Sequence, residues 1–250
     1  MKIKFNKEGD SFTFGFAIVM VVVVATLLSV AAISLKPFQN ENIKKEKMQN
    51  ILKTIRVDCT REEALGNFEK FVKQRLILNY QAEVISEKKG PIDENDKSDA
   101  FNIDIKKEFK SSMTDEEKNY PLFICEKGGK KYYVIPMIGK GLWGPIWGYI
   151  ALGEDYNTVY GASFDHKTET PGLGAEIRYE AFQNQFIGDQ ILDKSGNFVS
   201  IKVLKGGAAP DDLHGVDGLT GGTITSNGVT EMLKRTLNIY VPYFKKSQIN

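Results

Sequence analysis

The sequence of 250 residues is poor in the residues that build metal centres and disulfide scaffolds, with two cysteines and two histidines. Two widely spaced cysteines exclude a disulfide-dense scaffold and a metal site made of cysteine alone. The chain also lacks a charge excess, because 33 basic and 32 acidic side chains leave a formal net charge of +1. Binding to nucleic acid through its phosphates needs a basic excess or stripe, so this balance argues against it.

One segment has no charge at all. Residues 12–35 contain no Asp, Glu, Lys or Arg, and they exceed the ~20 apolar residues that a helix needs to cross a bilayer. The hydrophobic part of a secretory signal is shorter, about 7–15 residues, and ends at a small-residue cleavage site, which Ser34–Pro37 does not resemble. A membrane-spanning helix is therefore predicted. Lysines flank both ends, so the positive-inside rule leaves its orientation open.

The chain divides into four parts around this segment. A polar stretch after it leads into apolar positions at helical spacing, as in a stalk helix. No later change in composition is strong enough to separate two domains. The predicted parts are an N-terminal tail (1–11), a transmembrane helix (12–35), a stalk helix (36–59) and a soluble domain (60–250).

The first part of the soluble domain is predicted to consist of a helix and exposed loops. Thr60 and Glu63 have the spacing of a capping box, and the apolar residues after them predict a helix that runs to about Leu76. The charged segments 87–99 and 108–119 contain few hydrophobic residues. They are predicted to be exposed loops, and no function is assigned to them.

The second half of the chain changes to a strand-like pattern. Short β-branched and aromatic segments separated by glycine turns predict a meandering antiparallel sheet, and apolar residues at i, i+3, i+4 and i+7 predict an amphipathic C-terminal helix. The predicted strands cover 132–138, 146–152, 158–164 and 198–204, and the predicted helices 174–186 and 229–240. The fold class is α+β, a transmembrane helix followed by a mainly antiparallel sheet with packed helices.

Residues 217–228 (DGLTGGTITSNG) form the least ordinary segment, in which hydroxyls alternate with glycines directly before the C-terminal helix. A helix N-terminus has unpaired N–H groups and a positive dipole end, which favour a phosphate. The lysine of a P-loop is missing. The alternative is a capping loop with Ser226 or Asn227 as the N-cap. The residues alone leave both interpretations open.

The remaining reactive side chains are isolated in the sequence. His166 and His214 are lone histidines, which are more often structural than ligands. Cys59 and Cys125 can form a disulfide only if their Cα atoms approach within about 7 Å, and free buried cysteines usually act as small core residues. No catalytic residue and no metal ligand is predicted.

Three segments resemble the C subunit of the Na+-translocating NADH:quinone reductases. Asp217–Thr223 (DGLTGGT) resembles the flavinylation motif D-x-x-[ST]-G-[AG]-T, and residues 141–152 and 166–174 resemble two further segments of that protein. The single span and the length also fit. The resemblance implies that a separate flavin transferase recognises Asp217 and joins the phosphate of FMN to Thr223 as a phosphodiester. Thr220 and Gly222 replace the commoner serine and alanine of the motif.

The resemblance also implies where the flavin lies. Leu142 and Trp143 are expected to form one wall of an apolar slot, and a rigid Pro/Gly loop the other. Glu169 is expected either to hold this loop or to contact the flavin, and Lys202 or Lys205 to supply a cation to the phosphate. The remaining expected contacts are Thr170, Gly172, Leu173 and Gly174 in the loop, and Thr220, Gly221 and Gly222 beside Thr223.

The implied function is electron transfer inside a membrane complex. No G-x-G-x-x-G follows a predicted strand, so an NADH site is not expected and the chain is predicted to be a relay rather than an entry point. The resemblance implies partners in the other reductase subunits, the flavin transferase and membrane lipid, and a domain on the periplasmic side of a bacterial inner membrane. The alternatives are the G subunit of a related ferredoxin:NAD+ complex and a non-redox, membrane-anchored binding module.

Overall fold

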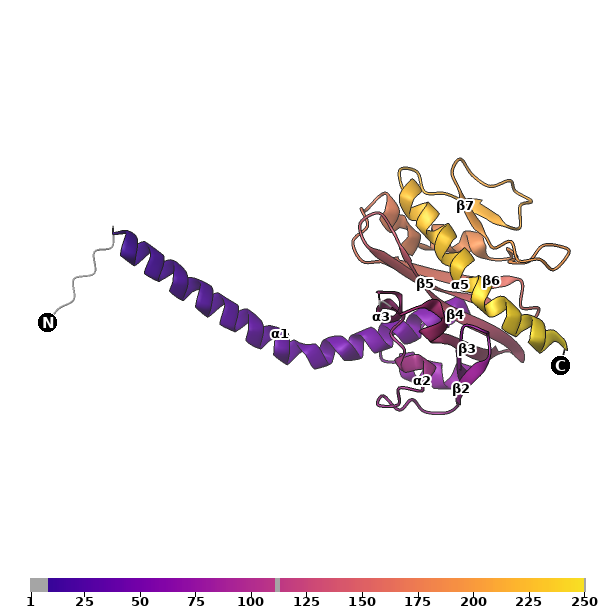
Figure 1. The fold of residues 1–250 in the computed structure, drawn as a ribbon, viewed down its shortest axis with the longest axis horizontal. Coiled ribbons are helices and arrows are strands. Elements are labelled where there is room, and N and C mark those ends of the chain that lie inside the picture. The colour runs from indigo at the N-terminus through magenta and orange to yellow at the C-terminus, as the bar shows by residue number, and fades with distance from the viewer. Residues whose placement is uncertain (1–8, 111–112, 250) are drawn as a thin grey trace. The chain divides into compact units, whose positions relative to one another are not determined.

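The computed structural model describes residues 9–110 and 113–249 (Figure 1). The chain divides into two compact units, Met1–Glu46 and Lys47–Asn250, and the structure describes the residues just given of each. The first unit is helical, and the second contains all the strands and the candidate site.

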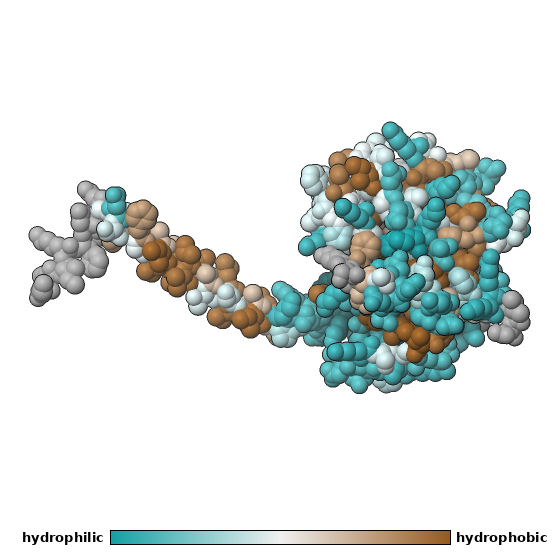
Figure 2. Space-filling view, viewed as in Figure 1, coloured by the Kyte–Doolittle hydropathy of each residue, from teal (hydrophilic) through white to brown (hydrophobic). Residues whose placement is uncertain are grey.

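Helix α1 (Asp10–Thr54) contains both the uncharged segment and most of the predicted stalk. It continues through Pro37, where a proline forgoes one backbone hydrogen bond. Among the described residues it is the one helix long and apolar enough to cross a membrane. Apolar side chains cover most of its first part (Figure 2), and large ones such as Phe14, Val21 and Ile33 are exposed. A segment of this kind fits a membrane anchor, because lipid can cover these side chains.

The second unit is built on a six-stranded antiparallel sheet of order β2-β1-β3-β4-β5-β6. Three of the predicted strands are confirmed, and neighbours in sequence pair through tight turns, as expected of a meander. The strands are β1 (Val72–Leu78), β2 (Val84–Lys88), β3 (Tyr120–Lys127), β4 (Lys130–Lys140), β5 (Pro145–Leu152) and β6 (Val159–His166).

Helices cover both faces of this sheet and create two hydrophobic clusters. The C-terminal helix α5 (Thr223–Ile249) packs on β4 and buries its apolar stripe in one cluster. The end of α1, Ile55 directly after it, and helix α2 (Ala64–Phe71) contribute to the other. The α+β fold class is thereby confirmed, with α5 lying across the sheet in Figure 1.

The remaining elements are short and surround the sheet. β7 and β8 pair in parallel as a separate two-stranded sheet. The elements are η1 (Ala100–Asn102), α3 (Ile105–Lys110), η2 (Asp115–Glu117), η3 (Gly174–Arg178), α4 (Glu180–Gln183), η4 (Asn184–Phe186), β7 (Lys202–Leu204) and β8 (Gly215–Asp217).

The helix predicted to run to Leu76 is wrong beyond Phe71, because Val72–Leu78 forms β1. Thr60 as the helix cap is also wrong, because α2 begins at Ala64 with Glu63 as its N-cap and without a side-chain capping bond. Glu63 does reach back to the Thr60 N–H, at 3.0 Å, in the turn before the helix. Leu76 is buried in one cluster and Ile77 in the other, as adjacent residues of a strand are. The apolar pattern belongs to a strand that is covered on both sides.

Two predictions in the second half are also wrong in part. The helix over 174–186 is broken at Tyr179, whose extended backbone angles separate η3 from α4. After it, a single α-helical turn passes directly into the 3-10 turn η4. The strand over 198–204 is reduced to Lys202–Leu204. Ser200, with φ of +64°, breaks the extended chain before it.

The charged segments are more structured than predicted. The first residues of the segment 87–99 belong to β2. Asp99, the last residue of this segment, is only 2% exposed and forms an ion pair with Arg75 in β1. In 108–119, Thr114 and Glu117 form a capping box around η2. Solvated loops were expected because the partner of Asp99 lies 24 positions earlier in the sequence.

Candidate functional site

Thr223 is the first residue of α5, and a glycine-rich turn connects it to β8. The Ser226 N–H donates to the Gly222 carbonyl at 2.9 Å, so the helical bonds begin at Gly222. The prediction of Ser226 or Asn227 as N-cap is therefore wrong, since both lie inside the first turn. Ser226 instead accepts from the Leu219 N–H at 3.1 Å, which folds the turn back onto the helix.

Two recesses flank Thr223, which is half-buried between them. We name them the Leu142 recess, of about 230 Å³, and the Lys205 recess, of about 260 Å³. The Leu142 recess is lined by Leu142, Glu169, Thr170, Leu173, Gly174, Gly221, Gly222, Thr223, Ile224 and Thr225. The Lys205 recess is lined by Val203, Lys205, Gly206, Gly218, Leu219, Thr220, Gly221, Thr223, Ser226 and Asn227.

The Leu142 recess brings three apolar side chains together from distant parts of the chain. Leu142 comes from the β4–β5 turn, Leu173 from the loop before η3 and Ile224 from the first turn of α5. All three are more than a third exposed, at 47%, 40% and 56%. Soluble domains seldom expose apolar groups together without a ligand or partner to cover them. The recess has the apolar lining with few polar groups that a flat aromatic ligand requires.

The Lys205 recess has a different chemistry, because its lining includes a cation, hydroxyls and three glycines. Lys205 lies in this recess, whereas Lys202 points from β7 to solvent and is not part of the lining. Asp217 braces the adjacent turn, since its carboxylate accepts from the Ala208 N–H at 2.8 Å. Cationic and N–H groups beside a hydroxyl at a helix N-terminus suit a phosphate.

Glu169 joins three segments around the Leu142 recess. Its carboxylate accepts from the Trp143 N–H at 2.8 Å and from the Thr225 hydroxyl at 2.6 Å. Its own N–H donates to Nδ1 of His166 at 3.1 Å. Of the two roles that the sequence left open, the one visible here is that of a brace, although the side chain also lines the recess.

Not every predicted site residue reaches a recess. The Trp143 side chain is 67% exposed and lines neither recess, so its contribution is the N–H bonded to Glu169. Gly172, with φ of +75°, turns the loop and donates to Glu176. Ile224 and Thr225 were not predicted, yet both line the Leu142 recess. Their only sequence signal is their place in the turn after Thr223.

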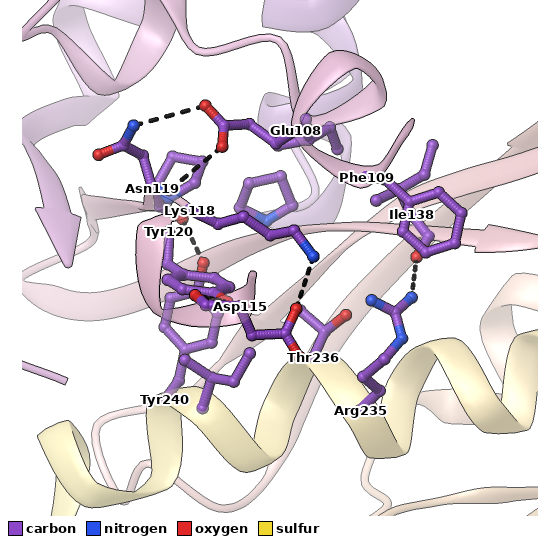
Figure 3. Close-up of a pocket in the computed structure, with 14 residues that line it drawn as sticks. Glu108, Phe109, Asp115, Lys118, Asn119, Tyr120, Ile138, Arg235, Thr236 and Tyr240 are labelled. Carbon is purple, nitrogen blue, oxygen red and sulfur yellow. Dashed lines mark hydrogen bonds and ion pairs between the residues drawn. The ribbon is translucent and has the colours of Figure 1, made fainter. Parts of the chain in front are cut away.

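A third recess lies on the other part of α5, between this helix, α3 and the start of β3 (Figure 3). It measures only about 50 Å³, too little for a flavin ring. Its charged side chains all have partners. Lys118 pairs with Asp115 at 2.5 Å, the Arg235 guanidinium donates to the Ile138 carbonyl at 2.5 Å, and Glu108 accepts from the Asn119 amide at 3.4 Å. This recess is a packing feature of the α3–α5 contact.

The described residues offer little other reactive chemistry. They contain no group of three or more His, Cys, Asp and Glu side chains that could hold a metal ion. Cys59 and Cys125 are free thiols, and burial raises the pKa of the Cys125 thiol far above its usual range. His214 bonds the Gln190 carbonyl through Nδ1 at 2.7 Å, a structural contact.

Comparison with known proteins supports the same region of the chain. Residues 141–238 match the FMN-binding domain family, and this range includes both walls of the Leu142 recess and Thr223. The chain is similar to the crystal structure of the Na+-translocating NADH-quinone reductase C subunit from Parabacteroides distasonis, with a TM-score of 0.73 and 39% identity over 84% of this chain and 96% of that one. NqrC from Shewanella oneidensis gives a TM-score of 0.65 at 27% identity, over 83% and 99%.

Relatives of similar length share the whole chain. The C subunit of the Na+-translocating NADH-quinone reductase of Haemophilus ducreyi is 30% identical over an alignment that covers 97% of this chain and 96% of that protein. The corresponding protein of Neisseria meningitidis is 30% identical over an alignment that covers 98% of this chain and 97% of that protein. The chain therefore belongs to the family formed by the C subunits of the Na+-translocating NADH-quinone reductases.

Proposed function

We propose that this chain is the electron-carrying subunit of a Na+-translocating NADH:quinone reductase, with FMN bound covalently through its phosphate to the hydroxyl of Thr223. The observation that carries the proposal is the position of Thr223, half-buried between an apolar and a cationic recess. A single phosphodiester there lets the ring enter one recess while the phosphate stays near Lys205. Flavin, when bound, supplies electron transfer.

Each part of the site has a task in this arrangement. Leu142, Leu173 and Ile224 exclude water from the ring. Thr170, with its exposed hydroxyl in the same lining, supplies a hydrogen bond to ring heteroatoms. The helix N–H groups and Lys205 hold the phosphate charge.

The chain does not supply the means to make the bond itself. The residues that line the Lys205 recess include no carboxylate or imidazole base. In the Leu142 recess the carboxylate of Glu169 accepts from the Trp143 N–H and the Thr225 hydroxyl rather than from Thr223. A threonine hydroxyl without a base bonded to it is a weak nucleophile. A separate flavin transferase that recognises Asp217 must therefore join the phosphate to Thr223.

The location follows from the anchor. We propose that α1 crosses a bacterial inner membrane in contact with lipid and that the sheet domain (60–250) faces the periplasm, with residues 36–59 as the stalk. A covalent bond prevents loss of the flavin from a domain on that side. The other reductase subunits are the electron partners.

The test is co-expression of the full chain with a flavin transferase, followed by denaturing electrophoresis and intact-mass analysis. We expect flavin fluorescence in the band and a mass increase of one FMN unit, both absent in Thr223→Ala. Thr236→Ala, the same change on the same helix outside both recesses, should keep the flavin. Peptide mapping that finds residue 223 bare beside an active transferase would refute the covalent bond.

A further inference from the structure

Glu169 is a buried carboxylate without a cation partner. It is only 5% exposed, and among the described residues no lysine or arginine forms an ion pair with it. Its two hydrogen bonds come from neutral donors, the Trp143 N–H and the Thr225 hydroxyl. Both oxygens act as acceptors, which is the arrangement of an ionised carboxylate. An uncompensated buried charge is costly, so its position beside a ligand recess needs a reason.

The backbone packs directly against this carboxylate. A Cβ atom added to Gly141 would lie 2.5 Å from Oε1 of Glu169, and one added to Gly174 would lie 2.5 Å from its Oε2. A Cβ at Gly174 would also collide with the Thr225 hydroxyl. Two glycines from different loops therefore make room for one charged group. The carboxylate is thus closely packed at the edge of the Leu142 recess.

The neighbouring histidine does not neutralise this charge. Nδ1 of His166 accepts from the Glu169 N–H at 3.1 Å, so this nitrogen carries no proton. The proton of a neutral ring then sits on Nε2, which is buried without a hydrogen-bond partner. His166 therefore braces the backbone of Glu169 and leaves the carboxylate charge as it is.

We infer that Glu169 sets the reduction potential of the bound flavin, because its fixed negative charge at the Leu142 recess opposes the addition of electrons to a ring lying there. The inference rests on the proposed function, since it requires flavin in this recess. The physical reason is Coulombic: a charge beside a poorly solvated site acts more strongly than one in water. Glu169 would thus favour the oxidised flavin and make the chain a low-potential carrier.

The test is a spectroelectrochemical titration of the flavin-loaded full chain in detergent, comparing Glu169→Gln with the unchanged protein. Glutamine keeps the size and the acceptor oxygen but removes the charge. At a given ambient potential we expect the ratio of reduced to oxidised flavin to rise at least tenfold, which corresponds to about 59 mV for one electron or about 30 mV for two.

Glu176→Gln is the matched control. Glu176 lies in η3, directly after this loop, and also accepts a backbone N–H, from Gly172 at 2.9 Å. It lines neither recess and is partly solvated. Removing the charge of Glu176 should change the ratio of reduced to oxidised flavin less than twofold. A purely structural role of Glu169 would lower the melting temperature of the flavin-free chain without moving the titration curve, so both are measured.

The outcomes separate this inference from the proposed function. Absence of covalent flavin from the unchanged chain refutes the proposed function. Glu169→Gln that carries flavin and titrates like the unchanged chain overturns the inference alone. If Glu169→Gln does not retain flavin, Thr225→Val decides instead. This substitution removes the hydroxyl that donates to Glu169 and keeps the carboxylate charge, which is then less compensated. The ratio of reduced to oxidised flavin should therefore fall severalfold, and an unchanged titration curve overturns the inference.

Discussion

Two buried carboxylates of the same domain are compensated in different ways. Asp99 is 2% exposed and lies against Arg75, also 2% exposed, which donates to it from Nε at 2.9 Å and from Nη2 at 2.8 Å. Glu169 is 5% exposed and receives only an amide N–H and a hydroxyl. The charge of Asp99 is balanced by the charge of Arg75, whereas Glu169 is bonded to neutral donors and its charge is not balanced.

The difference follows from what each acid is next to. Arg75 also donates to the carbonyls of Gly90 and Pro91, so the Asp99 pair ties the 90–99 segment to β1 beside the cluster formed with the end of α1. Glu169 lies where the β4–β5 turn, the 166–174 loop and α5 meet, at the edge of a recess. A paired charge stabilises a fold, whereas an unpaired one also acts on whatever occupies the recess.

The largest expected effect comes from removing the cation of the paired acid. Arg75→Met leaves Asp99 as an unpaired buried charge, and we expect the free energy of unfolding to fall by about 3–5 kcal/mol. Chemical denaturation of the full chain in detergent measures it. Arg178→Met, at an exposed arginine, should cost less than about 0.5 kcal/mol. Equal losses of unfolding free energy in the two variants would mean that the ion pair between Arg75 and Asp99 does not stabilise the fold.

The packing around the unpaired acid can be broken by a single methyl group. Gly174→Ala places a Cβ against the Glu169 carboxylate and the Thr225 hydroxyl, and we expect a loss of about 1–3 kcal/mol together with poor flavin loading. Gly66→Ala in α2 has open space around it and should stabilise the chain by about 0.5–1 kcal/mol. Unfolding midpoints and in-gel fluorescence measure both. Normal loading in Gly174→Ala would show that the position of Glu169 is not critical.

A third buried acid, Asp189, extends the comparison to a carboxylate without a donor on Oδ2. Burial first, and the charge of Asp212 next, raise the pKa of Asp189 to about 7, against an opposing effect of His214. The folded state then binds this proton more tightly than the unfolded state. The stability that the proton contributes is therefore complete below about pH 4 and is lost as the pH rises through 7.

Asp189→Asn should remove this dependence. Relative to the unchanged chain, the variant should gain about 1 kcal/mol or more between pH 5 and pH 8.5. Asp193→Asn is the control, because hydrogen bonds from Asn197 lower the pKa of Asp193 and its titration ends below that window. Thermal unfolding at several pH values gives the answer. A constant difference between Asp189→Asn and the unchanged chain across the window would contradict the assignment.

The smallest expected effect concerns the cation of the Lys205 recess. Lys205→Gln should slow flavin attachment about two- to fivefold, since an exposed cation contributes about 1 kcal/mol or less. Lys202→Gln, outside the recess, should leave the rate unchanged. The time course of in-gel flavin fluorescence measures both rates. If Lys202→Gln slowed flavin attachment and Lys205→Gln did not, the phosphate contact would belong to Lys202.

Local patterns in the sequence were enough for much of the fold. The strands β4, β5 and β6 and the helix α5 were predicted because alternation and helical periodicity depend on residues a few positions apart. Predictions failed where the environment of a residue in the folded domain differs from the environment that its local sequence pattern indicates. Val72–Leu78 is buried on both sides, and Asp99 in a charged segment meets an arginine on a strand.

The sequence by itself determined the uncharged helix, the antiparallel meander and the threonine that ends the D-G-L-T-G-G-T segment before a helix. Only the tertiary structure decided which groups meet there: Glu169 with Thr225, 56 positions away, Leu142 with Ile224 in one recess, and Lys205 rather than Lys202 in the other. Backbone preferences are local and can be read along the chain. The environment of a buried charge depends on the packing of segments that are distant in sequence, and it exists only after the chain has folded.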